Sequence, residues 1–202
     1  MQELVNLEAI DLSECKQLRH LPDLSGALKL KQLRLSGCEE LCELRPSAFS
    51  KDTLHTLLLD RCIKLESLMG EKHLTSLKYF SVKGCKNLKE FSLSSDSIKG
   101  LDLSKTGIEI LHPSIGDMNN LRLLNLEDLN LTNLPIELSH LRSLTELRVS
   151  TCSVVTKSML ETLFDGLGSL TLLHLKVRKS DCFRHWEFRQ GLGIRVVPRN
   201  SI

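Results

Sequence analysis

Apolar residues recur along this chain in one repeating order, in which two apolar positions flank a polar one and further leucines follow. The first copy consists of Leu7, Ile10, Leu12, Cys15, Leu18 and Leu21. Alternation of this kind predicts a short β-strand with one face buried. The first buried strand residues of the copies are Ile10, Leu33, Leu57, Phe80, Leu101, Leu124, Leu147 and Leu173, at spacings of 23, 24, 23, 21, 23, 23 and 26 residues.

Self-similarity at a period of about 20–29 residues, with Cys or Asn after Leu-x-Leu, is typical of leucine-rich repeats. We therefore predict an α/β fold, a leucine-rich-repeat solenoid with one curved parallel β-sheet and a mostly irregular convex side. The repeat domain is expected over residues 1–182, in about eight repeats, followed by a non-repeat C-terminal tail over residues 183–202. A helix is expected over residues 156–163, ended by Gly166 and Gly168.

One position after each strand forms a ladder inside the coil, where a small side chain can hydrogen-bond to the backbone. Cysteine is a small apolar residue with a weak donor, and threonine offers a hydroxyl in its place. Their spacing of a whole repeat differs from the close pairs of a zinc site, and a cytosolic chain keeps its thiols reduced. We predict buried, reduced, metal-free thiols within the structural ladder of Cys15, Cys38, Cys62, Cys85, Thr106 and Cys152.

The composition narrows the class of function. The 27 basic and 25 acidic residues give a formal charge of +2, and aromatic residues make up 4% of the chain. These values argue against a nucleic-acid partner. No apolar stretch reaches the ~20 residues of a membrane span, and the first residues do not read as a signal peptide. We expect a cytoplasmic location, with the nucleus as the alternative, and no membrane partner.

Catalytic and cofactor motifs are not recognisable in the sequence. A Gly-Lys-Thr phosphate loop is missing, and Gly191-Leu192-Gly193 lacks the third glycine of a dinucleotide loop. The histidines fall at unlike repeat positions, so no catalytic constellation can be assembled. We predict a protein that is not an enzyme and that needs no cofactor or metal.

The outward strand positions are the candidate binding surface. Solenoids use their concave sheet for recognition, and mixed charges favour a specific protein surface over a polyanion site. The alternative is that these are solvated positions without a partner. The predicted partner-binding residues of the concave face are Asp11, Arg34, Ser81, Asp102, Asn125, Arg148 and His174.

Two phrases of the repeats are distinctive. The first copy matches Leu-x-Leu-Ser-x-Cys-x-x-Leu-x-x-Leu-Pro with Ile10 in place of the opening leucine, and a later copy reads Leu101-Asp102-Leu103-Ser104-Lys105-Thr106-Gly107-Ile108. Both resemble the leucine-rich repeats of plant intracellular immune receptors that have a Toll/interleukin-receptor domain and a nucleotide-binding switch, and Lys83-Gly84-Cys85-Lys86-Asn87-Leu88 strengthens the resemblance. The resemblance implies that the region senses pathogen effectors and restrains the switch, with an effector or the receptor's own nucleotide-binding domain as the protein partner.

Two other readings of the repeats are open. The segment at 152–160 resembles the cysteine-containing repeat of F-box substrate receptors of ubiquitin ligases. A free-standing leucine-rich-repeat scaffold is the other alternative. The Leu-Pro endings at Pro22 and Pro135 fit the plant receptor class better than the F-box class.

Overall fold

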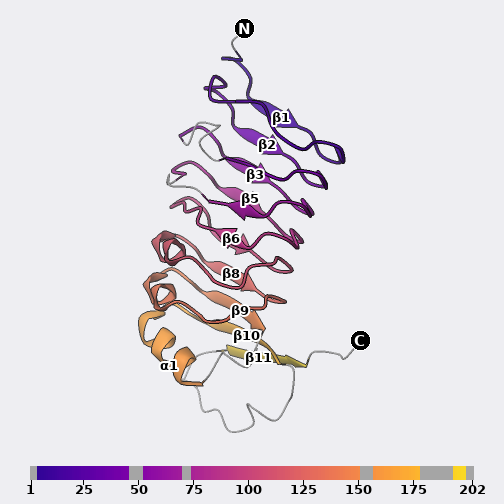
Figure 1. The fold of residues 1–202 in the computed structure, drawn as a ribbon. Coiled ribbons are helices and arrows are strands. Elements are labelled where there is room, and N and C mark those ends of the chain that lie inside the picture. Colours follow the sequence, from indigo (N-terminus) through magenta and orange to yellow (C-terminus); the bar gives the residue numbers. More distant parts are fainter. Residues whose placement is uncertain (1–3, 46–51, 70–73, 151–156, 178–192, 199–202) are drawn as a thin grey trace.

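Successive turns of the chain stack along one axis, and each turn adds a short parallel strand to the same side (Figure 1). The computed structural model describes residues 4–45, 52–69, 74–150, 157–177 and 193–198. The predicted α/β leucine-rich-repeat solenoid is confirmed. Its concave strands are β1 (Ala9–Asp11), β2 (Gln32–Arg34), β3 (Thr56–Leu58), β5 (Tyr79–Ser81), β7 (Gly100–Asp102), β8 (Leu123–Leu126), β9 (Glu146–Ser150) and β10 (Leu172–Val177).

The strands run parallel as predicted, but their hydrogen-bond ladder is interrupted once. One sheet has the order β1-β2-β3-β5, and the other runs from β7 through β8 and β9 to β10 and β11. The interruption coincides with the shortest spacing, the 21 residues between Phe80 and Leu101. Less chain is then available to carry β7 into line with β5. The backbone N–H of Gly84 still donates to the Ser104 carbonyl at 3.3 Å, which links the turns beyond these strands.

The leucines that face inward form one continuous core. Leu33, Leu57 and Leu59 are fully buried, as the alternation of each strand predicts. The first turn differs, because Leu7 and Ile10 are only partly buried. Within the described part of the chain this turn has a neighbour on one side only, whereas an inner turn packs between two.

The convex side is mostly irregular, with short helical and strand segments. It carries a small parallel pair, β4 (Ser67–Leu68) and β6 (Glu90–Phe91), followed by two 3-10 helices, η2 (Pro113–Asp117) and η3 (Ile136–His140). The predicted helix is present as α1 (Lys157–Gly166). Gly166 lies so close to η3 that an added Cβ would stand 2.6 Å from the Ser139 carbonyl oxygen. A glycine is therefore required where α1 packs on its neighbour.

The segment predicted as a tail contains one strand. β11 (Gly193–Pro198) pairs in parallel with β10, with Leu173 opposite Ile194. Part of this segment therefore continues the sheet, although its sequence lacks the repeat pattern. The boundary at residue 182 lies outside the described residues and stays a prediction.

Candidate functional site

The predicted binding residues lie in register on the outward side of the concave strands. Asp11 pairs with Arg34, and the same row continues through Leu58 to Ser81. Beyond the interruption of the sheet the row continues in β7 to β10. There the paired positions are Asp102, Asn125, Arg148 and His174. The fold thus brings together residues far apart in the sequence, in two runs of four positions each.

Three of these residues have a local structural task that the sequence analysis missed. The side-chain oxygens of Asp11, Asp102 and Asn125 accept hydrogen bonds of 2.9–3.0 Å from the backbone N–H two residues further on. Bonds of this type stabilise the bend that follows a strand. Asn125 is also the most buried of the three, at 7% exposure. It is therefore the least available to a partner.

Asp11 keeps its charge because its surroundings favour the ionised form. The hydroxyl and backbone N–H of Ser13 lower the pKa of the Asp11 carboxyl, and the Arg34 guanidinium lowers it further. The Arg34 Nη1 atom lies 3.9 Å from the Asp11 carboxylate, and Nη2 donates to Gln32 at 3.2 Å. Both side chains of the ion pair are about half exposed, so water and salt screen the pair. Arg34 can exchange this contact for one with a partner at little cost.

A second charged cluster lies at the other end of the concave face. The Arg148 Nε atom donates to the Glu146 carboxylate at 2.6 Å. The His174 Nε2 atom is buried 3.4 Å from the same oxygen, without hydrogen-bond geometry. Glu146 therefore lies between two basic side chains, of which Arg148 is the more exposed.

Tyr79 is a large exposed side chain of the concave strands that the sequence analysis did not predict as a binding residue. It is 67% exposed at the start of β5, on the outward side opposite Thr56. In the next turn Gly100 has no Cβ, and an added one would meet nothing within 4 Å. The available signal was the chain's single tyrosine standing immediately before a buried strand residue. The predicted binding residues stand between the two buried strand residues of each turn, whereas Tyr79 stands before the first of them.

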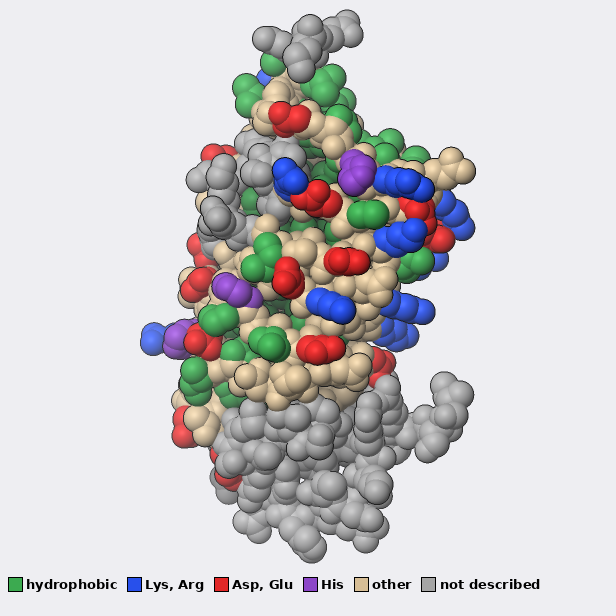
Figure 2. Space-filling model, viewed as in Figure 1, with side chains coloured by type: hydrophobic (Ala, Val, Ile, Leu, Met, Phe, Trp, Pro, Cys, Tyr) green, Lys and Arg blue, Asp and Glu red, His purple; other side chains and the backbone are tan. Residues whose placement is uncertain are grey.

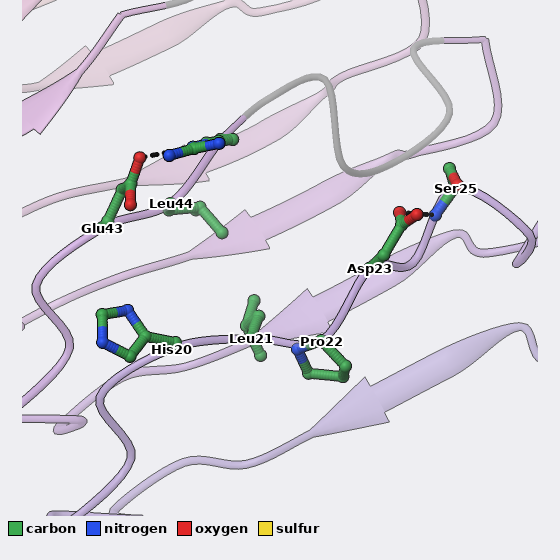
Figure 3. Close-up of a pocket in the computed structure, with 8 residues that line it drawn as sticks. His20, Leu21, Pro22, Asp23, Ser25, Glu43 and Leu44 are labelled. Carbon is green, nitrogen blue, oxygen red and sulfur yellow. Dashed lines mark hydrogen bonds and ion pairs between the residues drawn. The ribbon is translucent and has the colours of Figure 1, made fainter.

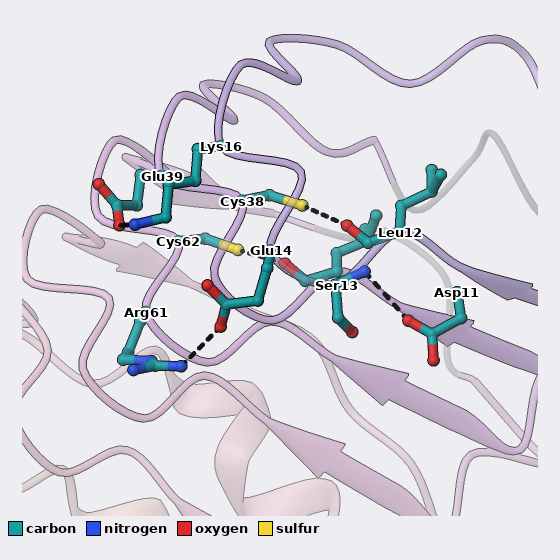
Figure 4. Close-up of polar contacts among 10 residues, drawn as sticks. Asp11, Leu12, Ser13, Glu14, Lys16, Cys38, Glu39, Arg61 and Cys62 are labelled. Carbon is teal, nitrogen blue, oxygen red and sulfur yellow. Dashed lines mark hydrogen bonds and ion pairs between the residues drawn. The ribbon is translucent and has the colours of Figure 1, made fainter.

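The ladder cysteines hold neighbouring turns together. The Sγ atoms of Cys38, Cys62 and Cys85 donate at 3.0–3.2 Å to backbone carbonyls of the preceding turn, at Leu12, Leu35 and Leu59. Figure 4 shows two of these bonds. The Thr106 hydroxyl instead donates at 2.8 Å to Leu103 in its own turn. The predicted hydrogen bond from the threonine hydroxyl to the backbone is therefore present, but it lies within one turn and ties no second turn.

Cys15 differs from the other described ladder cysteines. Cys15 is exposed, whereas Cys38, Cys62 and Cys85 are buried. The prediction that it is buried is wrong, because the stack covers the first turn on one side only within the described residues. Cys152 lies outside the described residues.

We expect thiol labelling to separate these cysteines. Burial, and then the neighbouring Cys62, raise the pKa of the Cys38 thiol to about 11, so little reactive thiolate exists at pH 8. A hydrogen bond with Cys85 and burial raise the pKa of Cys62 as well. In native buffer a maleimide should label the exposed Cys15 and Cys42 rapidly and the three buried thiols slowly, as followed by peptide mass spectrometry. Equal rates without denaturant would contradict the buried ladder.

A hollow of about 470 Å³ lies between the first two turns on the side away from the concave strands (Figure 3). Glu43 and Arg45 form an ion pair at its edge, and the Arg45 hydrogen bond lowers the pKa of the Glu43 carboxyl. The Asp23 carboxylate accepts the Ser25 backbone N–H at 2.9 Å. The charged side chains Asp23, Glu43 and Arg45 that line the hollow therefore already have partners within the chain. The lining residues are His20, Leu21, Pro22, Asp23, Ser25, Glu43, Leu44 and Arg45.

The described residues contain neither a cluster suited to a metal ion nor a helix suited to a membrane. No group of three His, Cys, Asp or Glu side chains is placed to hold a metal ion within the described ranges. Among the same residues, no helix combines the length and the apolar character that crossing a membrane requires.

Known proteins similar to this chain are plant disease resistance proteins. Disease resistance protein RPS4B of Arabidopsis thaliana is 37% identical over 155 residues, which cover 72% of this chain and 13% of that protein. Protein SUPPRESSOR OF npr1-1, CONSTITUTIVE 1 of the same plant is 36% identical over 171 residues, covering 74% and 12%. Disease resistance protein RPP2B is 39% identical over 142 residues, covering 70% and 12%. The chain thus spans about an eighth of the length of these relatives.

Neither a protein-family model nor a similar solved structure adds to what these relatives show. No protein-family model matches the chain. A solved leucine-rich-repeat protein of Leptospira interrogans is 19% identical, with a TM-score of 0.35 over 84% of this chain and 66% of that one. The fold assignment rests on the stacked parallel strands themselves.

The stacked strands and the buried leucine ladder define a leucine-rich-repeat protein. The chain is homologous to plant disease resistance proteins and matches only a part of each. The resemblance to the repeat region of that receptor class is confirmed.

Proposed function

We propose that the concave strands of this chain recognise a protein partner in plant defence. The observation that carries the proposal is Tyr79, which is 67% exposed at the start of β5, on the same outward side as Ser81. Its sheet also holds Arg34, and the second sheet holds Asp102, Asn125 and Arg148 in register. In this reading the chain is a binding module without catalytic activity.

Tyr79 has the properties of an interface anchor. A tyrosine can bury about 150–250 Å² of surface on binding, and it loses little conformational entropy. Energetic hot spots are enriched in Tyr, Trp and Arg.

The charges around the anchor favour specificity. Arg34 in one sheet and Asp102 and Arg148 in the other present both signs on the outward side of the concave strands. Complementary charges set the association rate and the choice of partner more than raw affinity. Arg34 and Arg148 remain at least one-third exposed, so both are accessible to a partner.

The names of the relatives support a role in plant defence. They are disease resistance proteins, so we propose that the partner is a pathogen effector or the receptor's own nucleotide-binding domain. Binding of either kind would take place in the cytoplasm or the nucleus. With the effector, the module senses infection; with the nucleotide-binding domain, it restrains the switch.

The proposal is tested with purified effectors and with the nucleotide-binding domain of a relative such as RPS4B, by biolayer interferometry. We expect Tyr79→Ala, and separately Arg34→Glu with Arg148→Glu, to weaken binding at least about tenfold while leaving the circular-dichroism spectrum unchanged. The convex side offers matched controls, because Ile136 is 54% exposed and Arg142 is also exposed. Ile136→Ala and Arg142→Glu should leave binding intact.

Two outcomes would contradict the concave surface as the binding site. One is partner binding that survives both the tyrosine and the double arginine variants. The other is binding that is lost only with the convex substitutions.

A further inference from the structure

A second surface runs along the turns that follow the concave strands. In each of six turns one residue has a left-handed backbone, with φ between 58° and 78°. Glycine stands at two of these positions and charged residues at the other four, although this conformation disfavours side chains with a Cβ. We call this row the flank; its residues are Glu14, Gly37, Arg61, Gly84, Lys105 and Asp128.

At the N-terminal end of the flank the charges neutralise one another. The Glu14 carboxylate lies 2.7 Å from the Arg61 Nη2 atom, two turns away (Figure 4). The contact passes over Gly37, where an added Cβ would stand 2.5 Å from Glu14 Oε1. Lys16 pairs with Glu39 at 3.2 Å, and Lys64 pairs with Glu40 at 2.7 Å.

The middle of the flank keeps an excess of positive charge. Lys105 belongs to the flank, and Lys83 and Lys86 stand directly before and two residues after Gly84. All three lysines are exposed, and within the described residues none of them forms an ion pair. Lysine and arginine side chains gather along the right-hand edge of the molecule in Figure 2. Adjacent turns are about 4.8 Å apart, well within the Debye length of ~8 Å at physiological salt. Gly84 lies between Arg61 and Lys105 and leaves the backbone uncovered there.

We propose that Lys83, Lys86 and Lys105 dock an acidic segment of a partner protein, rich in Asp and Glu. Flexible lysines suit mobile carboxylates, because an ammonium needs no fixed bidentate geometry. A nucleic acid is disfavoured, since the chain has a formal charge of only +2 and 4% aromatic residues, and so neither a strongly basic footprint nor a stacking platform for bases. The surface is distinct from the Tyr79 site and does not depend on it.

The probe is a fluorescein-labelled peptide of alternating Glu and Ser, with a Gln-Ser peptide as its uncharged counterpart. Binding is measured by fluorescence anisotropy on the full chain. We expect Lys83→Glu with Lys105→Glu to weaken binding of the acidic peptide at least about tenfold, and binding to fall as NaCl rises from about 50 to about 300 mM. The matched control is Lys78→Glu with Lys99→Glu, which changes the net charge equally at exposed lysines on the other side of the strands. The control should stay within about twofold of the wild type.

Other outcomes would overturn the proposal. Equal losses in the two double variants would mean that net charge alone attracts the peptide. Tighter binding of single-stranded DNA of equal charge, dependent on the same lysines, would make the flank a nucleic-acid surface. Tyr79→Ala should leave peptide binding intact, and its loss there would show that the acidic segment occupies the concave face. The proposed binding site around Tyr79 and the proposed lysine site can therefore be refuted independently of each other.

Discussion

Replacement of Leu57 by alanine is expected to lower the free energy of unfolding by about 2–5 kcal/mol. The Leu57 side chain is fully buried in β3, paired between Leu33 and Phe80 of the neighbouring strands. Alanine would remove its contacts and leave a cavity that two rigid neighbouring turns cannot fill. Urea unfolding followed by circular dichroism measures the change.

Arg34 provides the control on the adjacent strand. Its side chain is about half exposed, so Arg34→Ala should change the unfolding free energy by no more than about 0.5 kcal/mol. Similar losses in the two variants would mean that the buried and outward faces of the strands have been assigned the wrong way round.

Gly107→Ala is expected to lower the free energy of unfolding by about 1–3 kcal/mol. A Cβ at this position would stand 2.5 Å from the Lys86 carbonyl oxygen and 3.3 Å from that of Leu88. Both obstacles belong to the backbone of the preceding turn, so no side chain can rotate away. The turns must separate, and the packing between them is lost. Thermal and urea unfolding both report this change.

Gly26 offers a matched control for the glycine substitution. An added Cβ there would meet nothing within 4 Å, and its backbone is not left-handed. Gly26→Ala should be neutral or stabilise the fold by up to about 1 kcal/mol, through the lower entropy of the unfolded chain. If Gly107→Ala were equally harmless, the close approach of these two turns would be wrong.

The repeat frame made the core and the strand register predictable. Positions such as Leu33 and Leu101 follow from alternation, because a shift by one residue would turn every leucine into solvent. The interruption after β5 was visible only as a spacing of 21 residues, and spacing alone does not reveal which hydrogen bonds are lost. β11 carries no repeat pattern, so nothing in its sequence indicated that it continues the sheet.

The candidate site was less predictable because one side chain can serve two purposes. Asp11 and Asp102 face outward as expected, yet each is bound to the backbone of its own turn. The sequence indicated which face they occupy but not what they contact. The direction of the cysteine bonds was also hidden, since Cys38 reaches a carbonyl 26 residues earlier in the chain. Sequence spacing describes one turn, whereas these contacts form between turns.

The glycine between Glu14 and Arg61 on the flank bears on how such a stack can be rearranged. Solenoid stability is usually treated as a sum over adjacent repeats. Here Glu14 and Arg61 interact across an intervening turn, and Gly37 makes room for them. Removing the second turn, or exchanging it for a turn without glycine at this position, would break the contact between Glu14 and Arg61. For recombination or engineering, the three turns that carry Glu14, Gly37 and Arg61 are therefore best moved as one module.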